Sequence, residues 1–161
     1  MSTAGNHFYH EMLHMLHIEK GTEEHGETTA AATVVLFGRI FFAAIFLMSG
    51  PKHFAEQTIQ YAASQGVPLA SIAVPISGLM AIAGGLSVLL GYHARIGAWL
   101  LVLFLIPVTL MMHAFWRVTD PAMAQTQMVM FMKNISMLGG ALLITQFGAG
   151  PFSLDARRRH D

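Results

Sequence analysis

Four long apolar stretches limit what this chain can fold into more than any other feature of its sequence. They cover residues 31–50, 70–92, 96–116 and 128–150. Within them only Arg39 and Lys133 carry a charge. A helix needs about 20 apolar residues to cross the hydrocarbon core of a bilayer, and each stretch meets that requirement. The sequence therefore predicts an all-α fold, a four-helix transmembrane bundle.

The remaining segments divide the chain into three parts. We expect a histidine-rich N-terminal tail over residues 1–30, a four-span membrane domain over residues 31–150 and a basic C-terminal tail over residues 151–161. The tail is expected to contain an amphipathic helix followed by a linker. Residues 51–69 mix apolar and polar side chains, which predicts an interfacial segment between spans 1 and 2.

Charge and cysteine content exclude several classes of function. Lys+Arg and Asp+Glu number nine each, so the net charge is zero and nothing indicates a nucleic-acid partner. The absence of cysteine excludes disulfides and thiolate metal sites. Basic residues are more numerous in the two tails and in the loop between spans 2 and 3 than in the other loops. The positive-inside rule then predicts that both termini are cytoplasmic. The expected location is a bacterial-type plasma (inner) membrane.

Polar residues gather near one face of the predicted bundle. Because successive spans alternate in direction, the end of span 1, the start of span 2, the end of span 3 and the start of span 4 share that face. The polar residues placed there are Lys52, His53, His113, Trp116, Arg117, Lys133 and Asn134, with Arg39 deeper in span 1. A cation at the bilayer centre costs about 2.5–3.5 kcal/mol on insertion scales, so we expect these side chains to turn inward and meet.

No carboxylate lies within the spans to neutralise Arg39 or Lys133, so carbonyl groups, water, a partner's acid or an anionic or quinone-like ligand must do so. Single residues also have ordinary structural interpretations. Lys133 can extend to the interface, Trp116 can belong to an aromatic belt, and His113 can be a packing residue. The whole cluster favours an inward site more than any one member does, because ionisable groups are rare inside membranes.

The sequence HEMLH at residues 10–14 matches the H-E-x-x-H motif of zinc proteases. The extended motif requires glycine and histidine where this chain has His17 and Lys20, and no glutamate between Glu27 and Glu56 offers a third ligand. A metalloprotease is therefore not expected.

The histidines of the tail nevertheless share one face of a predicted helix. They are His7, His10, His14 and His17. Three interpretations stay open: a site for a transition metal or haem, an amphipathic helix that lies on the membrane or on a partner, and a disordered tail.

Several pieces of the sequence resemble the DoxX family of four-helix membrane proteins. They are GRIFFAAIFLMSGPKHF at 38–54, GLMAIAGGLSVLLGYHARIGA at 78–98, HAFW at 113–116, MFMKNISMLGGALLI at 130–144 and GAGPFSLDA at 148–156. The resemblance implies association with redox enzymes, since some members are subunits of a thiosulfate:quinone oxidoreductase. It implies the motif residues Arg39, His113, Trp116, Lys133 and Asn134. One departure is Ala81, where the family often has a glutamate.

The residues and the resemblance together predict a membrane-embedded subunit of a quinone-linked redox complex. The expected catalytic residues are His113, Lys133, Asn134 and Arg39, near the extracytoplasmic face, and the expected quinone-binding residues are Trp116, Lys52, His53 and Arg117. The partners would be the lipid bilayer and other subunits or further copies of the chain, with electron carriers on the partners. The alternatives are a non-catalytic assembly anchor and a metal- or haem-binding protein that uses the histidines of the tail. Whether the chain is itself an enzyme stays open.

Overall fold

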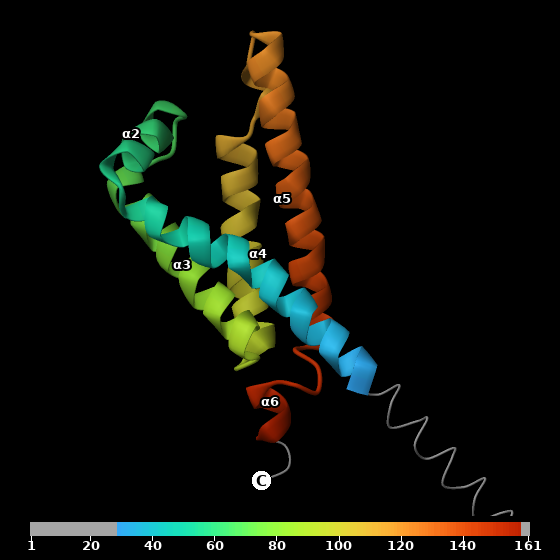
Figure 1. The fold of residues 1–161 in the computed structure, drawn as a ribbon. Helices are drawn as coiled ribbons and strands as arrows, with labels where there is room; N and C mark the ends of the chain where they lie inside the picture. Colours follow the sequence, from blue (N-terminus) through green and yellow to red (C-terminus); the bar gives the residue numbers. More distant parts are fainter. Residues whose placement is uncertain (1–28, 159–161) are drawn as a thin grey trace, which may run out of the picture.

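The computed structural model describes residues 29–158, and every regular element within this range is a helix (Figure 1). The first span is Thr29–Phe54, and its last turn is the 3-10 helix η1 (Gly50–Phe54). The other elements are α2 (Glu56–Ser64), α3 (Ala70–Leu90), α4 (Ala94–Met112), η2 (Phe115–Arg117), α5 (Pro121–Phe147) and α6 (Leu154–Arg157).

Four helical segments of the described range are long and apolar enough to cross a membrane. They are Thr29–Phe54, Ala70–Leu90, Ala94–Arg117 and Pro121–Phe147. The predicted all-α, four-helix membrane bundle is confirmed. The N-terminal amphipathic helix that the sequence predicts lies outside the described residues.

The segment between the first span and α3 forms the short helix α2 at one end of the bundle, opposite α6 (Figure 1). Its apolar face lies against the bundle, because Ala62 is buried with Ala70 and Val74. Its other face is polar, and Gln60 donates a hydrogen bond to Glu56 there. This division into two faces is the one that an interfacial helix requires.

Glycines bring the helices of the bundle into close contact at two places. A Cβ atom on Gly84 of α3 would lie 2.8 Å from the Gly97 carbonyl oxygen of α4, and one on Gly78 would lie 2.9 Å from the Gly50 carbonyl oxygen. In a bilayer, where burial of apolar surface favours helix association little, such close packing is a main source of attraction.

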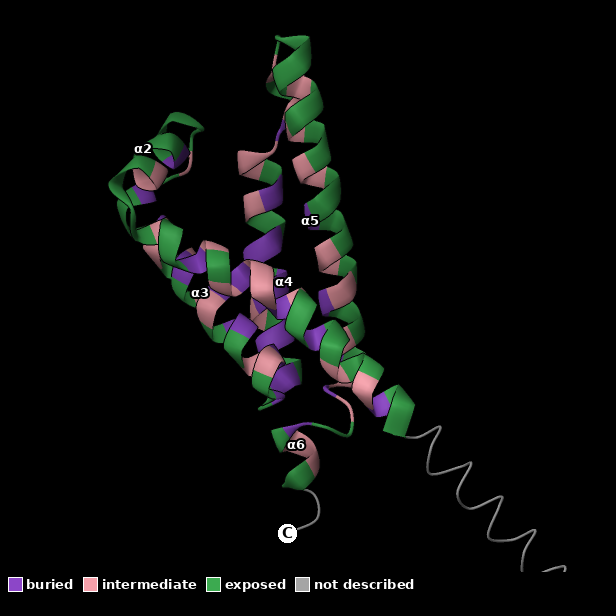
Figure 2. Cartoon of the chain, viewed as in Figure 1, coloured by how far each residue is buried: buried purple, intermediate pink, exposed green. Residues whose placement is uncertain are grey.

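Many residues on the outside of the spans are exposed (Figure 2), and large apolar residues are frequent among them. Phe41, Leu79 and Leu143 are examples from three different spans, and each is more than half exposed. A soluble monomer rarely carries so much contiguous apolar surface, whereas lipid chains cover it without cost.

The C-terminal segment is held against the end of the bundle by two charged side chains. Arg39, which is 4% exposed, donates hydrogen bonds to the carbonyl oxygens of Ala149 (2.6 Å) and Phe152 (2.7 Å). The Asp155 carboxylate accepts hydrogen bonds from the backbone N–H groups of His93 (2.8 Å) and Ala94 (3.0 Å) at the start of α4. These contacts join the first span, α4 and the segment after α5.

Candidate functional site

A polar cavity of about 160 Å³ lies inside the bundle, between the first span, α4 and α5. Its polar side chains are Ser49, His53, His113, Lys133 and Asn134. Its apolar wall consists of Ile45, Phe46, Phe104, Leu105, Val108 and Met137. The cavity therefore combines hydrogen-bonding groups from three spans with an apolar surface.

Asn134 is the buried polar residue of this cavity. The residue is 5% exposed, and its side-chain amide makes no hydrogen bond to any residue of the described range. The amide is not fully enclosed, because in the described range Arg39 Nε is the one buried side-chain nitrogen or oxygen without a partner, so the Asn134 amide remains accessible from the cavity. An amide without a protein partner on the wall of a cavity can form hydrogen bonds with a ligand in that cavity.

Both histidines of the cavity are oriented through their Nδ1 atoms. The Ser77 hydroxyl donates its hydrogen to the Val74 carbonyl oxygen (2.7 Å), so Ser77 Oγ accepts from His53 Nδ1–H (2.8 Å). His113 Nδ1–H donates to Gln127 Oε1 (2.9 Å). Among residues 29–158 the Nε2 atom of neither ring has a hydrogen-bond partner, so a neutral ring could accept a hydrogen bond there.

Lys133 is the cation of the cavity. Within residues 29–158 its only hydrogen bond joins Nζ to the Met130 sulfur (3.2 Å), and a thioether is a weak acceptor. The Lys133 side chain lines the cavity, and part of it is also exposed at the surface of the bundle. Its ammonium group therefore retains unused donors at the cavity wall.

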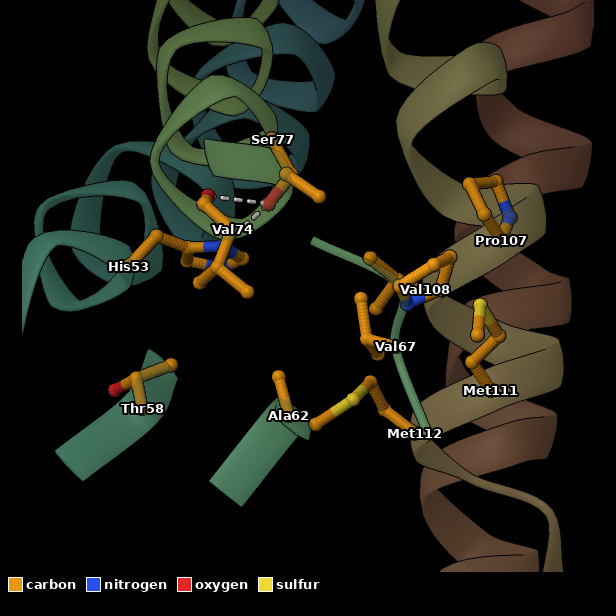
Figure 3. Close-up of a pocket in the computed structure, with 12 residues that line it drawn as sticks. His53, Thr58, Ala62, Val67, Val74, Ser77, Pro107, Val108, Met111 and Met112 are labelled. Carbon is orange, nitrogen blue, oxygen red and sulfur yellow. Dashed lines mark hydrogen bonds between the residues drawn. The ribbon is translucent and has the colours of Figure 1, made fainter. Parts of the chain in front are cut away.

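A second, apolar cavity of about 290 Å³ lies between α2, α3 and α4 (Figure 3). His53 and Val108 line both cavities, so the two adjoin at these residues. Figure 3 shows His53 and Ser77 on one side of the apolar cavity, with Met111 and Met112 of α4 on the other. A long apolar group in this cavity would lie directly beside the polar one.

Comparison with known proteins identifies the family of the chain. The SURF4 family model matches residues 67–160, which include α3, α4 and α5. The chain belongs to the SURF4 family. Inner membrane protein YphA of Escherichia coli (strain K12) is 32% identical over 130 residues, which cover 80% of this chain and 92% of YphA. Inner membrane protein YqjF of the same organism is 29% identical over 123 residues, which cover 75% of this chain and 88% of YqjF.

No solved structure matches the chain significantly. The relatives are inner membrane proteins, and the chain has four helices suited to crossing a bilayer, so this SURF4-family protein is a membrane protein. Neither relative's name assigns an activity, a ligand or a partner.

The resemblance to the DoxX family was wrong, because the matching family is SURF4 and both relatives are YphA-like inner membrane proteins. Most residues of the resembling motifs are small or apolar. Such residues meet a requirement common to tightly packed four-helix membrane proteins, as the contact between Gly84 and Gly97 illustrates. They therefore distinguish poorly between families, and Ala81 already departed from the DoxX pattern.

The structure separates the residues that the sequence grouped into one site. His53, His113, Lys133 and Asn134 line the polar cavity. The expectation that Arg39 joins them is incorrect, because Arg39 binds the carbonyl groups of Ala149 and Phe152 at the other end of the bundle. Its position near the middle of an apolar stretch gave no information about which carbonyl groups the folded chain would bring to it.

Three further predicted residues lie outside both cavities. Lys52 and Arg117 are exposed and line neither of them. Trp116 is 54% exposed and packs edge-to-face against Phe115 and Phe131. The structure thus places Trp116 in an aromatic cluster on the outside of the bundle and not on a cavity wall.

Sequence reasoning missed Ser49, Ser77 and Gln127, which line the cavity or orient its histidines. Gln127 had a usable signal, because it lies two helical turns before Asn134 and therefore on the same face of α5. Ser77 had none, because its partner His53 is in a different span.

The proposed metal ligands His7, His10, His14 and His17 lie outside the described residues. Within residues 29–158 no three histidine, aspartate or glutamate side chains are grouped so that they could hold a metal ion.

Proposed function

We propose that this protein binds a quinone in its two adjoining cavities and acts as the membrane-embedded subunit of a quinone-linked redox complex. The observation that carries the proposal is the buried Asn134 amide, which lines the polar cavity without a partner in the described range. A ligand with carbonyl oxygens would accept hydrogen bonds from this amide and from the Lys133 ammonium group.

The sizes of the cavities support a quinone over a purely polar or purely apolar ligand. The polar cavity, at about 160 Å³, is close to the size of an engineered cavity of about 150 Å³ that binds benzene. It therefore suits one six-membered ring. The apolar cavity beyond His53 and Val108, at about 290 Å³, suits the first part of an isoprenoid tail.

In this proposal the chain binds the quinone and transfers protons, while a partner subunit supplies electrons. Reduction of a quinone to a quinol adds a pair of electrons and a pair of protons to the ring oxygens. His113 is the proposed proton-exchanging group, because Gln127 holds its Nδ1–H and leaves Nε2 free. The electrons come from a redox cofactor of the partner subunit, so turnover requires the whole complex.

The proposal also places the quinone site toward the extracytoplasmic side. Arg95, Arg157 and Arg158 lie at the end of the bundle opposite the polar cavity, and basic residues favour the cytoplasmic side. Both termini are then cytoplasmic. A quinone would enter from the lipid phase and would not need to cross the aqueous surface of the protein.

Direct titration of the purified protein in lipid nanodiscs tests the proposal. The probe is a ubiquinone with a single isoprene unit, and binding is followed by isothermal titration calorimetry. Lys133→Met and Asn134→Leu each remove one donor from the polar cavity. Each is expected to weaken binding about tenfold, which corresponds to ~1.4 kcal/mol for one lost hydrogen bond.

Lys52→Met is the matched control, because Lys52 is an exposed cation at the same end of the bundle that lines neither cavity. It should leave quinone affinity unchanged. Absence of binding by the unmodified protein, or equal affinities in all variants, would refute the quinone site. If Lys133→Met instead lowers the amount of co-purifying complex at unchanged quinone affinity, the function is that of an assembly anchor.

A further inference from the structure

A third cavity, of about 400 Å³, lies at the end of the bundle opposite the polar cavity, between the start of α4 and the end of α5. His93, Arg95 and Ile96 line it from the α4 side, and Phe147, Gly148 and Ala149 line it from the α5 side, with Asp155 between them. This cavity is separate from the proposed quinone site and shares no residue with it.

Arg95 is the unpaired charge of this cavity. It makes no hydrogen bond or ion pair with any residue from 29 to 158, and a Cβ atom on Gly148 would lie 3.5 Å from its Nε atom. Within the described range Asp155 makes no ion pair with Arg95, and its carboxylate oxygens instead accept the backbone N–H groups of His93 and Ala94. The planar guanidinium therefore keeps its donors for an outside ligand.

The surroundings of Arg95 are also positive. Arg158 donates a hydrogen bond to His93 Nε2 (3.1 Å). Arg39 is buried and donates to the Ala149 carbonyl oxygen, and its Nε atom has no partner among residues 29–158. In the described range Asp155 is the single acidic residue at this end of the bundle. Among the described residues positive charge therefore exceeds negative charge around this cavity, which favours an anionic ligand.

Apolar side chains adjoin the same cavity on its outer side. Ile96 is 62% exposed and Phe147 is 80% exposed, and Trp99 lies one helical turn beyond Arg95 on α4. A free anion makes no use of this surface. The acyl chains of a lipid can lie along it while the head group reaches the guanidinium.

We propose that this cavity binds the phosphate group of an anionic phospholipid, with Arg95 as its principal ligand. Guanidinium and phosphate form charge-assisted hydrogen bonds in a bidentate geometry. Basic pockets between spans at the cytoplasmic side are recognised sites for anionic head groups. The proposal is independent of quinone binding, because it concerns different residues at the opposite end of the bundle.

Native mass spectrometry of the purified full-length chain tests the proposal. The protein is exchanged into detergent with phosphatidylglycerol, with phosphatidylcholine or with inorganic phosphate alone. We expect retention of phosphatidylglycerol and little retention of phosphatidylcholine. Arg95→Gln should lower the retained phosphatidylglycerol about fivefold, the effect expected for loss of one arginine at a membrane surface.

Arg117→Gln is the matched control, because Arg117 is an exposed arginine at the other end of the bundle. It should retain phosphatidylglycerol as the unmodified protein does. Equal retention by Arg95→Gln and the unmodified protein would overturn the site. Equal stabilisation by inorganic phosphate and phosphatidylglycerol, compared by thermal unfolding, would overturn the assignment to a lipid. An unchanged unfolding temperature of Arg95→Gln in phosphatidylcholine confirms that the variant is folded.

Discussion

Replacing Asn134 by leucine is expected to stabilise the ligand-free protein and to remove its response to quinone. The residue is 5% exposed, and its amide has no hydrogen-bond partner in the described range, although it remains accessible from the cavity. A fully buried, unpaired amide costs about 1–3 kcal/mol, and because this amide is accessible from the cavity we expect a cost at or below the lower value. Leucine removes it and has room in a cavity of about 160 Å³.

Thermal unfolding in detergent micelles, with and without the short-chain ubiquinone, measures both parts of this prediction. Without quinone, Asn134→Leu should unfold at a higher temperature than the unmodified protein. With quinone in excess, the unmodified protein should gain stability that rises with the logarithm of the free quinone concentration, and the variant should gain much less. Substitution of a residue that serves binding should raise stability and lower ligand binding, whereas substitution of a residue that serves packing should lower stability.

Thr145→Val is the control for a buried polar residue on the same helix. The Thr145 hydroxyl is already satisfied by the Leu142 carbonyl oxygen (2.7 Å), so its loss should change stability by less than about 1 kcal/mol and leave the quinone response intact. A lower unfolding temperature of ligand-free Asn134→Leu would show that the amide has a stabilising partner. An undiminished quinone response in that variant would remove Asn134 from the site.

Two further predictions concern the fold. Asp155→Ala removes two hydrogen bonds to backbone N–H groups that join α6 to α4, so the free energy of unfolding in detergent should fall by about 2–4 kcal/mol. Asp120→Ala removes a single local cap and should lower it by about 1 kcal/mol. Equal losses in the two variants would mean that the contact between α6 and α4 is weak. Gly84→Ala would press a methyl group against the α4 backbone and should cost about 1–3 kcal/mol. Gly139→Ala, where nothing lies within 4 Å, should instead stabilise the helix by about 0.5–1 kcal/mol, and a reversed order of the two melting temperatures would contradict the packing described above.

The part of the candidate site that the sequence predicted rests on alternation of span direction. This alternation places His53, His113, Lys133 and Asn134 at one end of the bundle whatever the helix packing, and the structure brings all of them to one cavity. Arg39 was misplaced for the opposite reason. Its depth along the first span could be counted, but its partners, Ala149 and Phe152, come from a segment more than 100 residues away.

Motif similarity was the weaker source of information. The resembling pieces, which run from the first span to the segment after α5, led to the wrong family, and the glycines among them meet a packing demand that is common to many membrane bundles. The structure also shows that these glycines are not equivalent. A Cβ atom on Gly84 would meet the backbone of the neighbouring helix, whereas a Cβ atom on Gly139 would meet nothing within 4 Å.

The apolar stretches by themselves determined the number of spans, their approximate ends and the all-helical fold. A single long apolar segment crosses a bilayer as a helix, because only a helix pairs all of its backbone N–H and C=O groups within the segment. This requirement depends on local composition alone. The rotation of each helix about its axis was decided only by the tertiary structure. Rotation depends on how distant surfaces such as Gly84 and Gly97 fit together, and it determines that Asn134 faces a cavity while Trp116 faces outward.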